Sequence, residues 1–430
     1  MNLNQAISLW DDVSPARKTP KTLTEQVSAD VVIIGGGIVG LSSALQLAKK
    51  GYQVVLLEAK TIGSGASGRN NGQVIPVLSG AEPAAIERRY GETGERFVAL
   101  IRDSASDLFQ LAKDEKIDCE AEQTGWFQPA HSKDHLAVSQ WRNNAWEKRG
   151  APCKMLDGTQ SKTMLGSSQW YGGMFNPTGG HINPKAFVLG LANACERLGV
   201  QIFENTPALD INKKQNSWII NTPSGYVKAD AVLLATNAYS NEQAPNLAPK
   251  MAKTVVPVTS FQIATKPLDE KLQKSIIPNR EAVSDTRGDL QYFRYDARNR
   301  LVSGGALIYK GNMAQRLKNL VGNRLAMAFP QLGVPEITHV WSGYVGITMD
   351  RFPHFYKLGD NFWSWSGCNG RGLALGVSLG REFANAIEGK TDIALLFEEP
   401  KPIAFHSIVT KLAPSALAYY RWLDGQKPKL

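Results

Sequence analysis

The sequence predicts an α/β fold with one domain built on a parallel sheet and another built on an antiparallel sheet. Residues 30–58 have the pattern of a strand, a glycine-rich turn, a helix and a second strand, which is typical of a βαβ unit. Residues 255–265, 290–295 and 300–307 read instead as strands of an antiparallel sheet. At 430 residues, the chain is long enough for two or three domains with large cores.

The βαβ unit carries the residues that a dinucleotide-binding turn requires. An apolar strand at 30–34 is followed by Gly35, Gly37 and Gly40. The first glycine permits the tight turn, the second lets the backbone approach a pyrophosphate, and the third lets the helix pack closely on the strand. The positive end of the helix then faces the phosphates. We therefore expect a bound dinucleotide.

The end of this unit narrows the choice of dinucleotide. The helix stops at Gly51, and the second strand, 53–57, ends in Glu58. An acid at this position accepts both ribose hydroxyls and argues against NADP, whose 2′-phosphate it would repel. The glycine, serine and asparagine-rich loop 61–73 follows directly, at the edge of the sheet where such folds bind their ligands. We expect this loop to wrap the ligand.

The middle of the chain is predicted to be mostly scaffold. We expect helices at 83–116, with a break near 91–94, at 135–148 and at 185–198. A strand that ends within 231–238 then turns abruptly from apolar to small polar residues. This change indicates a second approach of the chain to the nucleotide.

A second glycine-rich helix start favours FAD over NAD. Residues 362–387 read as a strand, a glycine-rich turn and a helix, so backbone amides are again presented at a helix N-terminus. One helix N-terminus suits the pyrophosphate, and the other suits the anionic end of a flavin ring. The tail, 394–430, mixes basic, aromatic and apolar residues. We expect it to pack on the body, with membrane contact as the alternative.

Composition excludes several classes of function. The formal net charge is +9, but basic residues occur only in scattered pairs, so no nucleic-acid partner is expected. The four cysteines form no CxxC pair and no metal-ligand spacing, so we expect no metal and reduced thiols. The N-terminus lacks a basic-then-apolar signal, and no window approaches the ~18 apolar residues of a membrane span. We expect a cytoplasmic protein, with peripheral contact to the inner face of the membrane left open.

Seven segments between about residues 28 and 390 form an ordered set: VVIIGGGIVG, GSGASGRNNGQ, NPTGGHINP, VLLATNAYS, YFR at 292–294, WSGYVGITMDRFPHF and GCNGRGLALG. Taken in order, they resemble the D-amino-acid oxidase family of FAD-dependent amine oxidoreductases, and most of all its gamma-glutamylputrescine oxidase-like branch. The resemblance implies a Rossmann-like FAD-binding domain interleaved with an antiparallel-sheet substrate domain. The implied FAD-binding domain comprises residues 28–82, 181–244 and 337–393, and the substrate domain comprises 83–180 and 245–336.

The resemblance also implies the reaction and the residues around the cofactor. Hydride moves from the carbon that bears an amine to flavin N5, and the resulting imine hydrolyses to a carbonyl compound. The helix that starts near Leu373 would stabilise the charge of the reduced flavin at N1 and O2. The positions carried over to FAD are Gly35, Gly37, Ile38, Val39, Gly40, Glu58, Ala59, Ser64, Ser67, Gly68, Arg69, Asn70, Asn71, Gly72, Gln73, Thr236, Gly343, Thr348, Gly370, Arg371, Gly372 and Leu373.

Two departures from the family pattern affect the flavin and its electron acceptor. Sarcosine oxidases of this family attach flavin through a cysteine in the segment that matches 341–351, and here that segment has none. We therefore expect non-covalent FAD. Those oxidases also carry a lysine thought to activate oxygen on the strand that matches 300–304, where this chain has none. The acceptor, oxygen or quinone, is left open.

Five residues are candidates for the substrate pocket, each with a structural alternative. Arg294 could clamp a substrate carboxylate or simply face solvent. Tyr292 could shape the pocket or belong to the core, and His181 could orient the substrate or make a structural hydrogen bond. Trp341 and Tyr344 could form a wall of the amine site or pack in the core.

The leading hypothesis is FAD-dependent oxidation of a C–N bond in a small amine or amino acid, with gamma-glutamylated amines first among substrates by resemblance. The alternative within the same chemistry is a membrane-associated, quinone-linked dehydrogenase of D-amino or cyclic imino acids. A hypothesis of another class is a flavin-binding protein that acts on a macromolecule, against which the scattered positive charge argues. The substrate, its stereochemistry and the oligomeric state do not follow from the sequence.

Overall fold

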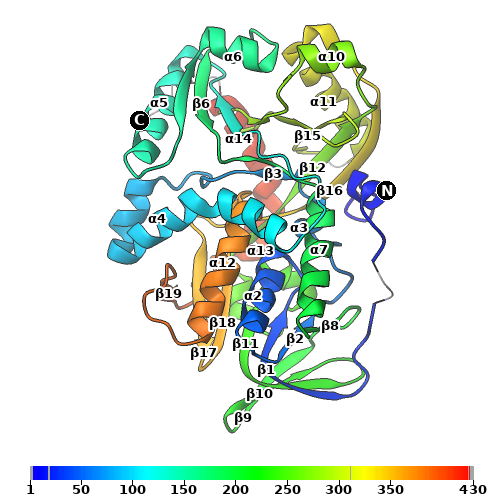
Figure 1. Cartoon of the computed structure of the whole chain (residues 1–430), viewed down its shortest axis with the longest axis vertical. Helices are drawn as coiled ribbons and strands as arrows, with labels where there is room; N and C mark the ends of the chain where they lie inside the picture. The colour runs from blue at the N-terminus through cyan, green and yellow to red at the C-terminus, as the bar shows by residue number, and fades with distance from the viewer. Residues whose placement is uncertain (1–2, 18–19, 310, 425, 427–430) are drawn as a thin grey trace.

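Two large sheets, one in the lower and one in the upper half of Figure 1, organise the chain. The structure is a computed structural model and describes residues 3–17, 20–309, 311–424 and 426. The lower sheet is mostly parallel and contains the βαβ unit, whereas the upper sheet is mostly antiparallel. This arrangement confirms the predicted α/β fold with two kinds of sheet.

The lower sheet is buried on both faces. Val31 and Ile33 of the first strand pack into one hydrophobic core, and Val32 and Ile34 pack into another, which explains the continuously apolar strand. The first strand pairs in parallel with its two neighbours. In sheet order, the strands are β19 (Phe397–Glu398), β17 (His354–Gly359), β18 (Phe362–Ser366), β11 (Tyr226–Leu234), β1 (Gln26–Ile34), β2 (Val54–Leu57) and β8 (Gln201–Phe203), with β10 (Ser217–Asn221) and β9 (Asp210–Lys214) added beside β11.

Helices cover one face of the lower sheet. Figure 1 shows α12 (Gly372–Ile387), α2 (Ile38–Lys49) and α7 (Pro184–Arg197) side by side in front of its strands. The long helix α4 (Pro83–Asp114) packs against α12 and breaks at Gly91, where φ is 56° and ψ is −135°. These helices and the break agree with the sequence prediction.

The upper sheet forms the second core. Helix α11 (Met313–Ala328) packs on it through Leu317, Val321 and Leu325, which join Phe293 and Leu301 of the sheet in one hydrophobic cluster. In sheet order, the strands are β16 (Ile337–Ile347), β12 (Val256–Thr265), β15 (Leu301–Gly305), β14 (Tyr292–Tyr295), β13 (Ala282–Ser284), β4 (Trp126–Pro129), β6 (Gly172–Asn176) and β5 (Lys154–Asp157).

Strand β16 pairs along its length with β12 in the upper sheet. The resemblance implied that residues 337–393, which include this strand, belong to the FAD-binding domain. The chain crosses to the lower sheet only at β17 and β18. The glycine-containing motif of β16 therefore approaches the cofactor region from the substrate side.

The remaining elements connect these layers. Across the described residues, none of the helices combines the length and apolar character that crossing a bilayer requires. A small sheet pairs β3 (Gln73–Val74) with β7 (Gly180–His181). The other helices are α1 (Leu9–Val13), α3 (Ala66–Arg69), α5 (Lys133–Glu147), α6 (Gly158–Leu165), η1 (Asn237–Tyr239), α8 (Ser240–Gln243), α9 (Pro249–Ala252), α10 (Glu270–Ser275) and η2 (Pro330–Leu332).

The C-terminal tail packs on the body, as the sequence predicted. It forms α13 (His406–Leu412), η3 (Ala413–Ser415) and α14 (Ala416–Leu423), which lie across the middle of the molecule in red in Figure 1. Leu417 of α14 is buried, and His406 of α13 hydrogen-bonds through Nε2 to the carbonyl of Val255 at 2.9 Å. Residues 425 and 427–430 of the predicted tail lie outside the described residues.

Candidate active site

A cavity of about 460 Å³ lies where the two sheets meet. Its lower wall is formed by the ends of β1, β2 and β11, the carboxyl edge at which parallel sheets bind ligands. Its upper wall is formed by Val258, Thr259, Ser260 and Gln262 of β12 and by Gly343, Tyr344, Val345 and Ile347 of β16. The cavity therefore joins the dinucleotide motif to the antiparallel sheet.

The glycine turn at the lower end has the close packing that the sequence predicted. Gly35 has φ of +110°, a conformation that side chains rarely adopt. A Cβ atom on Gly40 would lie 2.0 Å from the carbonyl oxygen of Gly35, so only glycine lets α2 start this close to β1. The Ile38 amide of the first turn donates to Ser67 Oγ at 3.1 Å. The helix N-terminus thus opens toward the cavity beside the predicted wrapping loop.

Glu58 stands at the end of β2 with its carboxylate fixed by two amides. Oε2 accepts a hydrogen bond from Gly36 N and Oε1 accepts one from Lys60 N, both at 2.9 Å. Burial raises the pKa of the carboxyl group although these two bonds lower it. Glu58 lines the cavity next to the glycine turn, which is the position that a ribose-binding acid needs.

The loop after Glu58 is held by its own side chains. Asn70 Oδ1 accepts from Gly72 N at 2.8 Å, and Asn71 Oδ1 accepts from Gln73 N at 2.9 Å. Gln73 Nε2 donates to the carbonyls of Val283 and Phe293 in the upper sheet at 2.8 and 3.1 Å. The loop therefore links both walls of the cavity.

The second glycine-rich turn, 367–372, is fixed by two asparagines. Asn369 Oδ1 accepts from Thr348 N at 3.0 Å, and Asn237 Oδ1 accepts from Gly367 N at 3.1 Å. Helix α12 begins at Gly372, so its first amides face the cavity beside this turn.

Arg371 brings an uncompensated positive charge to this turn. Its guanidinium makes no hydrogen bond or ion pair with any described residue, and it lies 5.8 Å from the ring centre of Trp126. Burial, and to a lesser degree the like charge of Arg142, lowers the pKa of Arg371 to about 10, so it stays charged at neutral pH. Since Arg371 lines the cavity, an anionic group bound there would meet this charge.

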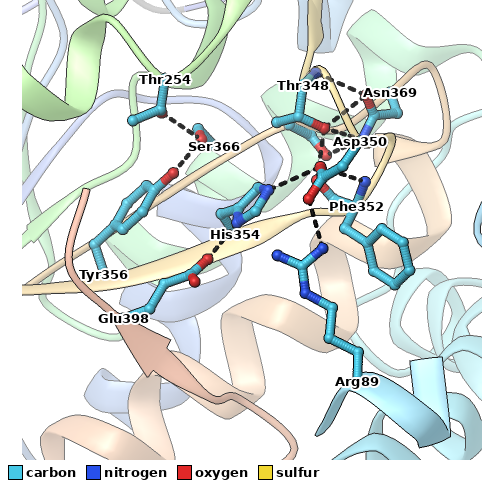
Figure 2. A network of polar contacts seen from close by, with 11 residues as sticks. Arg89, Thr254, Thr348, Asp350, Phe352, His354, Tyr356, Ser366, Asn369 and Glu398 are labelled. Carbon is cyan, nitrogen blue, oxygen red and sulfur yellow. Dashed lines mark hydrogen bonds and ion pairs between the residues drawn. The ribbon is translucent and has the colours of Figure 1, made fainter. Parts of the chain in front are cut away.

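An ion-pair network supports the chain that leads to this turn. Figure 2 shows His354 between Asp350 and Glu398, with Arg89 on the far side of Asp350. His354 Nε2 lies 3.0 Å from Asp350 Oδ1. Burial alone would lower the pKa of His354, but the hydrogen bonds to Asp350 and Glu398 outweigh it and raise the pKa to about 9. The imidazolium therefore stabilises the folded state.

Replacing His354 with glutamine is expected to reduce the free energy of unfolding by about 2–3 kcal/mol at pH 7. A folded-state pKa raised above the unfolded value of 6.5 stabilises fully below pH 6.5, and this stabilisation is lost as pH rises through about 9. Urea unfolding at pH 6, 7.5 and 10 measures the difference between the two proteins. The matched control is His339→Gln, whose partner Asp12 has a side chain that is 53% exposed, with an expected loss below about 1 kcal/mol. An equal loss for His354→Gln at pH 6 and pH 10 would contradict the assignment.

The sequence that forms this cavity belongs to a stretch that matches a known family of enzymes. A family profile described as "DAO: FAD dependent oxidoreductase" matches residues 30–386. The chain belongs to this family. It is an FAD-dependent oxidoreductase that oxidises a C–N bond of an amine or amino acid, as the sequence predicted.

Several family members are similar over most of the chain. Gamma-glutamylputrescine oxidoreductase of Escherichia coli (strain K12) is 32% identical over 373 residues, which are 86% of each chain. The probable oxidoreductase OrdL of Haemophilus influenzae is 33% identical over 414 residues, 94% of this chain and 93% of that one. Among solved structures, glycine oxidase of Geobacillus kaustophilus has a TM-score of 0.71 at 22% identity and covers 85% of this chain and 96% of its own. L-Proline dehydrogenase from P. horikoshii has a TM-score of 0.73 at 21% identity, covering 87% and 96%, so both structures share the fold.

Most of the family positions predicted to hold FAD come together in the cavity. Tyr292 and Tyr344, predicted for the substrate pocket, line it as well. The predicted FAD positions in its lining are Gly35, Gly37, Ile38, Val39, Glu58, Ala59, Ser64, Ser67, Arg69, Asn70, Asn71, Gln73, Thr236, Gly343, Gly370, Arg371, Gly372 and Leu373.

Four predicted FAD positions lie behind the cavity wall. Gly40 packs beneath Gly35, and Gly68 is so close to Gly63 that a Cβ would lie 2.2 Å from its carbonyl oxygen. Gly72 packs in the same way against the Ile182 carbonyl. Thr348 donates through Oγ1 to Phe352 O at 2.7 Å and supports the turn from outside, as Figure 2 shows. These residues shape the wall without facing a ligand.

Arg294 lies outside the cavity lining, and its geometry does not support the predicted carboxylate clamp. Its guanidinium is buried and donates three hydrogen bonds to the carbonyls of Asn71, Tyr295 and Ile182, at 2.7, 2.8 and 2.8 Å. It also lies 4.5 Å from the ring centre of Trp10. Arg294 thus anchors the loop that follows Glu58 to the upper sheet.

His181 and Trp341 also have structural partners instead of cavity positions. His181 is buried, and its Nε2 hydrogen-bonds to Arg280 O at 2.9 Å. Burial, with the charge of Arg294, holds the pKa of His181 well below its usual value, so the ring is neutral. Trp341 Nε1 donates to Arg69 O at 2.8 Å. Trp341 thus holds the loop that contains the cavity residue Arg69, whereas His181 joins β7 to the loop that precedes β13.

Several cavity residues were not predicted. Tyr239 lies in the segment VLLATNAYS and could have been found there, whereas Gln262, Asp289 and Leu417 carried no such signal. Tyr239 lines the cavity, and its ring centre lies 5.4 Å from that of Tyr344. Gln262 accepts a hydrogen bond from Tyr292 Oη at 2.7 Å. Asp289 and Leu417 line the same cavity from a loop and from the tail helix. Only the pairing of the upper sheet and the docking of α14 bring these residues together.

Proposed function

We propose that this enzyme oxidises a gamma-glutamylated amine with non-covalently bound FAD. The observation that carries the proposal is one cavity that runs from the glycine turn and Glu58, past Arg371, to the upper sheet. The substrate class is supported by the similarity to gamma-glutamylputrescine oxidoreductase over most of both chains.

The residues of the lower cavity fit FAD. The glycine turn at Gly35 leaves no room for a Cβ on Gly40, so α2 starts close to β1, where the positive end of the helix would face a pyrophosphate. Glu58 would accept the adenosine ribose hydroxyls, and the first amides of α12 would face the flavin ring. When bound, FAD supplies the hydride acceptor and gains negative charge on its ring.

Arg371 supplies the main electrostatic contribution of the chain to this step. Its unpaired guanidinium and the positive end of α12 stand on the same turn, so both stabilise negative charge that develops nearby. The same charge disfavours an ammonium group in its vicinity, so it favours the neutral amine from which hydride can leave. The chain thus binds and orients the amine while the cofactor receives the electrons.

Two features bear on how FAD is held and reoxidised. The segment 341–351 has no cysteine, which supports non-covalent FAD. Strand β15, which covers most of the segment in which the related oxidases carry an oxygen-activating lysine, contains no lysine.

The second candidate function is a membrane-associated dehydrogenase that passes electrons to quinone. It is favoured by exposed apolar side chains on the tail, among them Phe405 at 80% and Trp422 at 59% exposure.

Anaerobic titration of the yellow holoenzyme with a panel of amines tests the proposal. We expect gamma-glutamylputrescine to bleach the flavin at lower concentration than glycine, D-alanine or proline do. Bleaching by the amino acids alone would contradict the proposed substrate class.

The same protein also tests the electron acceptor. On readmission of air, hydrogen peroxide formed at the turnover rate indicates an oxidase, and turnover only with a quinone dye supports the second candidate. Acid precipitation of the same sample should leave all flavin in solution.

A further inference from the structure

The tail helix α14 lies at the part of the cavity that is lined by the loops before β14 and after β15. Leu417 lines the cavity together with residues 288–290 and 305–306. Arg421, four residues later, lies on the same face of the helix. Its Nε donates to Asp289 Oδ2 at 2.7 Å, and its Nη2 donates to the carbonyl of Ala306 at 3.2 Å. The helix is therefore docked on the cavity wall through a charged residue.

Asp424, at the C-terminal end of α14, binds the backbone of the loop that contains Asp289. The Asp424 carboxylate accepts hydrogen bonds from the amides of Gly288 and Asp289, at 2.6 and 3.2 Å. On the other side, Arg324 of α11 pairs with Asp289 Oδ2. We call Asp289, Arg324, Arg421 and Asp424 the outer cluster.

The outer cluster has hydrogen-bonding capacity that the described protein does not use. Asp289 lines the cavity at 5% exposure, and its Oδ1 has no partner among the described residues. Nη1 of Arg421 likewise has no partner there, whereas Nη1 of Arg324 is buried without one. Arg324 and Arg421 both pair with the single carboxylate of Asp289, which leaves positive charge in excess at that carboxylate while Asp289 Oδ1 can still accept a hydrogen bond. A ligand group that carries both a carboxylate and a donating ammonium matches these two features better than a singly charged one.

We propose that the outer cluster binds the α-amino-acid end of the substrate, with the ammonium group at Asp289 Oδ1 and the carboxylate at Arg421. The inference rests on the proposed function, because a gamma-glutamylated amine carries the amine to be oxidised at one end and a zwitterionic α-amino acid at the other. Arg324 holds Asp289 in place from behind the cavity wall. Binding of the α-amino-acid group at the outer cluster would then set how far the amine at the other end of the substrate reaches toward the flavin.

This arrangement makes the tail helix part of substrate selection. An amine without the α-amino-acid end would leave Asp289 Oδ1 and Arg421 Nη1 without a partner, so it would form fewer charge-assisted hydrogen bonds on binding. We expect the wild-type enzyme to prefer gamma-glutamylputrescine over N-butanoylputrescine, which has the same chain without the two charged groups, by about 100-fold in kcat/KM.

Two variants test the outer cluster. For each holoenzyme, the selectivity ratio is kcat/KM for gamma-glutamylputrescine divided by kcat/KM for N-butanoylputrescine. Asp289→Asn and Arg421→Met are each expected to lower the ratio by about tenfold or more, through the KM of the glutamylated amine. Arg421→Lys should restore part of the ratio because it keeps the charge. The matched control is Trp422→Ala on the same helix, whose side chain is 59% exposed and contacts Tyr419, and which should keep the ratio. Bound FAD and thermal unfolding are recorded for every variant.

The outcomes separate the inference from the proposed function. If the wild-type enzyme oxidises gamma-glutamylputrescine but both variants change the two substrates equally, the outer cluster only docks the helix and the inference is wrong. If the wild-type flavin is bleached by other amines and not by gamma-glutamylputrescine, the proposed substrate class fails and the inference fails with it. A ratio that collapses in both cluster variants and survives in Trp422→Ala supports the inference.

Discussion

Replacing Gly40 with alanine is expected to lower the affinity for FAD by about 100-fold or more. The new Cβ would lie 2.0 Å from the Gly35 carbonyl oxygen and 3.3 Å from Ile33 Cγ2. Because real Cβ atoms do not come so close to backbone, α2 must move away from β1. Its N-terminal amides then leave the position that the pyrophosphate requires. Titration of the apoprotein with FAD, followed by flavin fluorescence, measures the loss.

The control for this variant lies at the other end of the same helix. Gly51 has φ of +88°, and nothing lies within 4 Å of an added Cβ. Gly51→Asn is therefore expected to keep FAD affinity within about twofold, since asparagine tolerates this conformation. Overpacking at Gly40 should also cost about 1–3 kcal/mol of stability. Unchanged FAD affinity in Gly40→Ala would show that the contact between α2 and β1 does not position the helix N-terminus.

The sequence predicted the parts of the fold that local pattern determines. The βαβ unit, the break of α4 at Gly91 and the start of α12 at Gly372 each depend on residues close together in the chain. Glycine-rich turns at strand ends are recognisable because few other residues fit there. The residues predicted for the dinucleotide end of the site follow from such local patterns, and most of them line one cavity.

The substrate end was not predictable, because it depends on pairing between distant segments. The sequence made Arg294 the candidate for a substrate carboxylate and Arg371 a residue beside the flavin. Arg294 donates to three backbone carbonyls, whereas the Arg371 guanidinium has no hydrogen-bond partner among the described residues. The sheet to which β16 belongs could not be predicted for the same reason, since its partner β12 lies about eighty residues earlier. The outer cluster needs a loop, a helix and the tail in one place, and only tertiary packing brings them together.

Replacing Arg371 with leucine is expected to have opposite effects on stability and on catalysis. The folded-state pKa of about 10, lowered mainly by burial, means that keeping this guanidinium charged opposes folding at neutral pH, and this cost disappears as pH rises above 10. Arg371→Leu should therefore raise the stability of the apoprotein by about 1–3 kcal/mol at pH 7. Thermal unfolding of the FAD-free proteins measures this gain.

The same change should slow flavin reduction at saturating amine by about 100-fold. Arg371 is the charge on the turn at which α12 presents its amides, so leucine removes stabilisation of negative charge that forms there in the reaction. Arg371→Lys retains the charge and is expected to recover much of the rate, whereas leucine keeps only the packing against Trp126. Stopped-flow reduction by gamma-glutamylputrescine compares the three proteins. If Arg371→Leu is more stable than the wild-type enzyme and reduces its flavin equally fast, the charge of Arg371 takes no part in the reaction. If it is more stable but reduces its flavin slowly, the enzyme retains an unpaired cation for catalysis at a cost in stability.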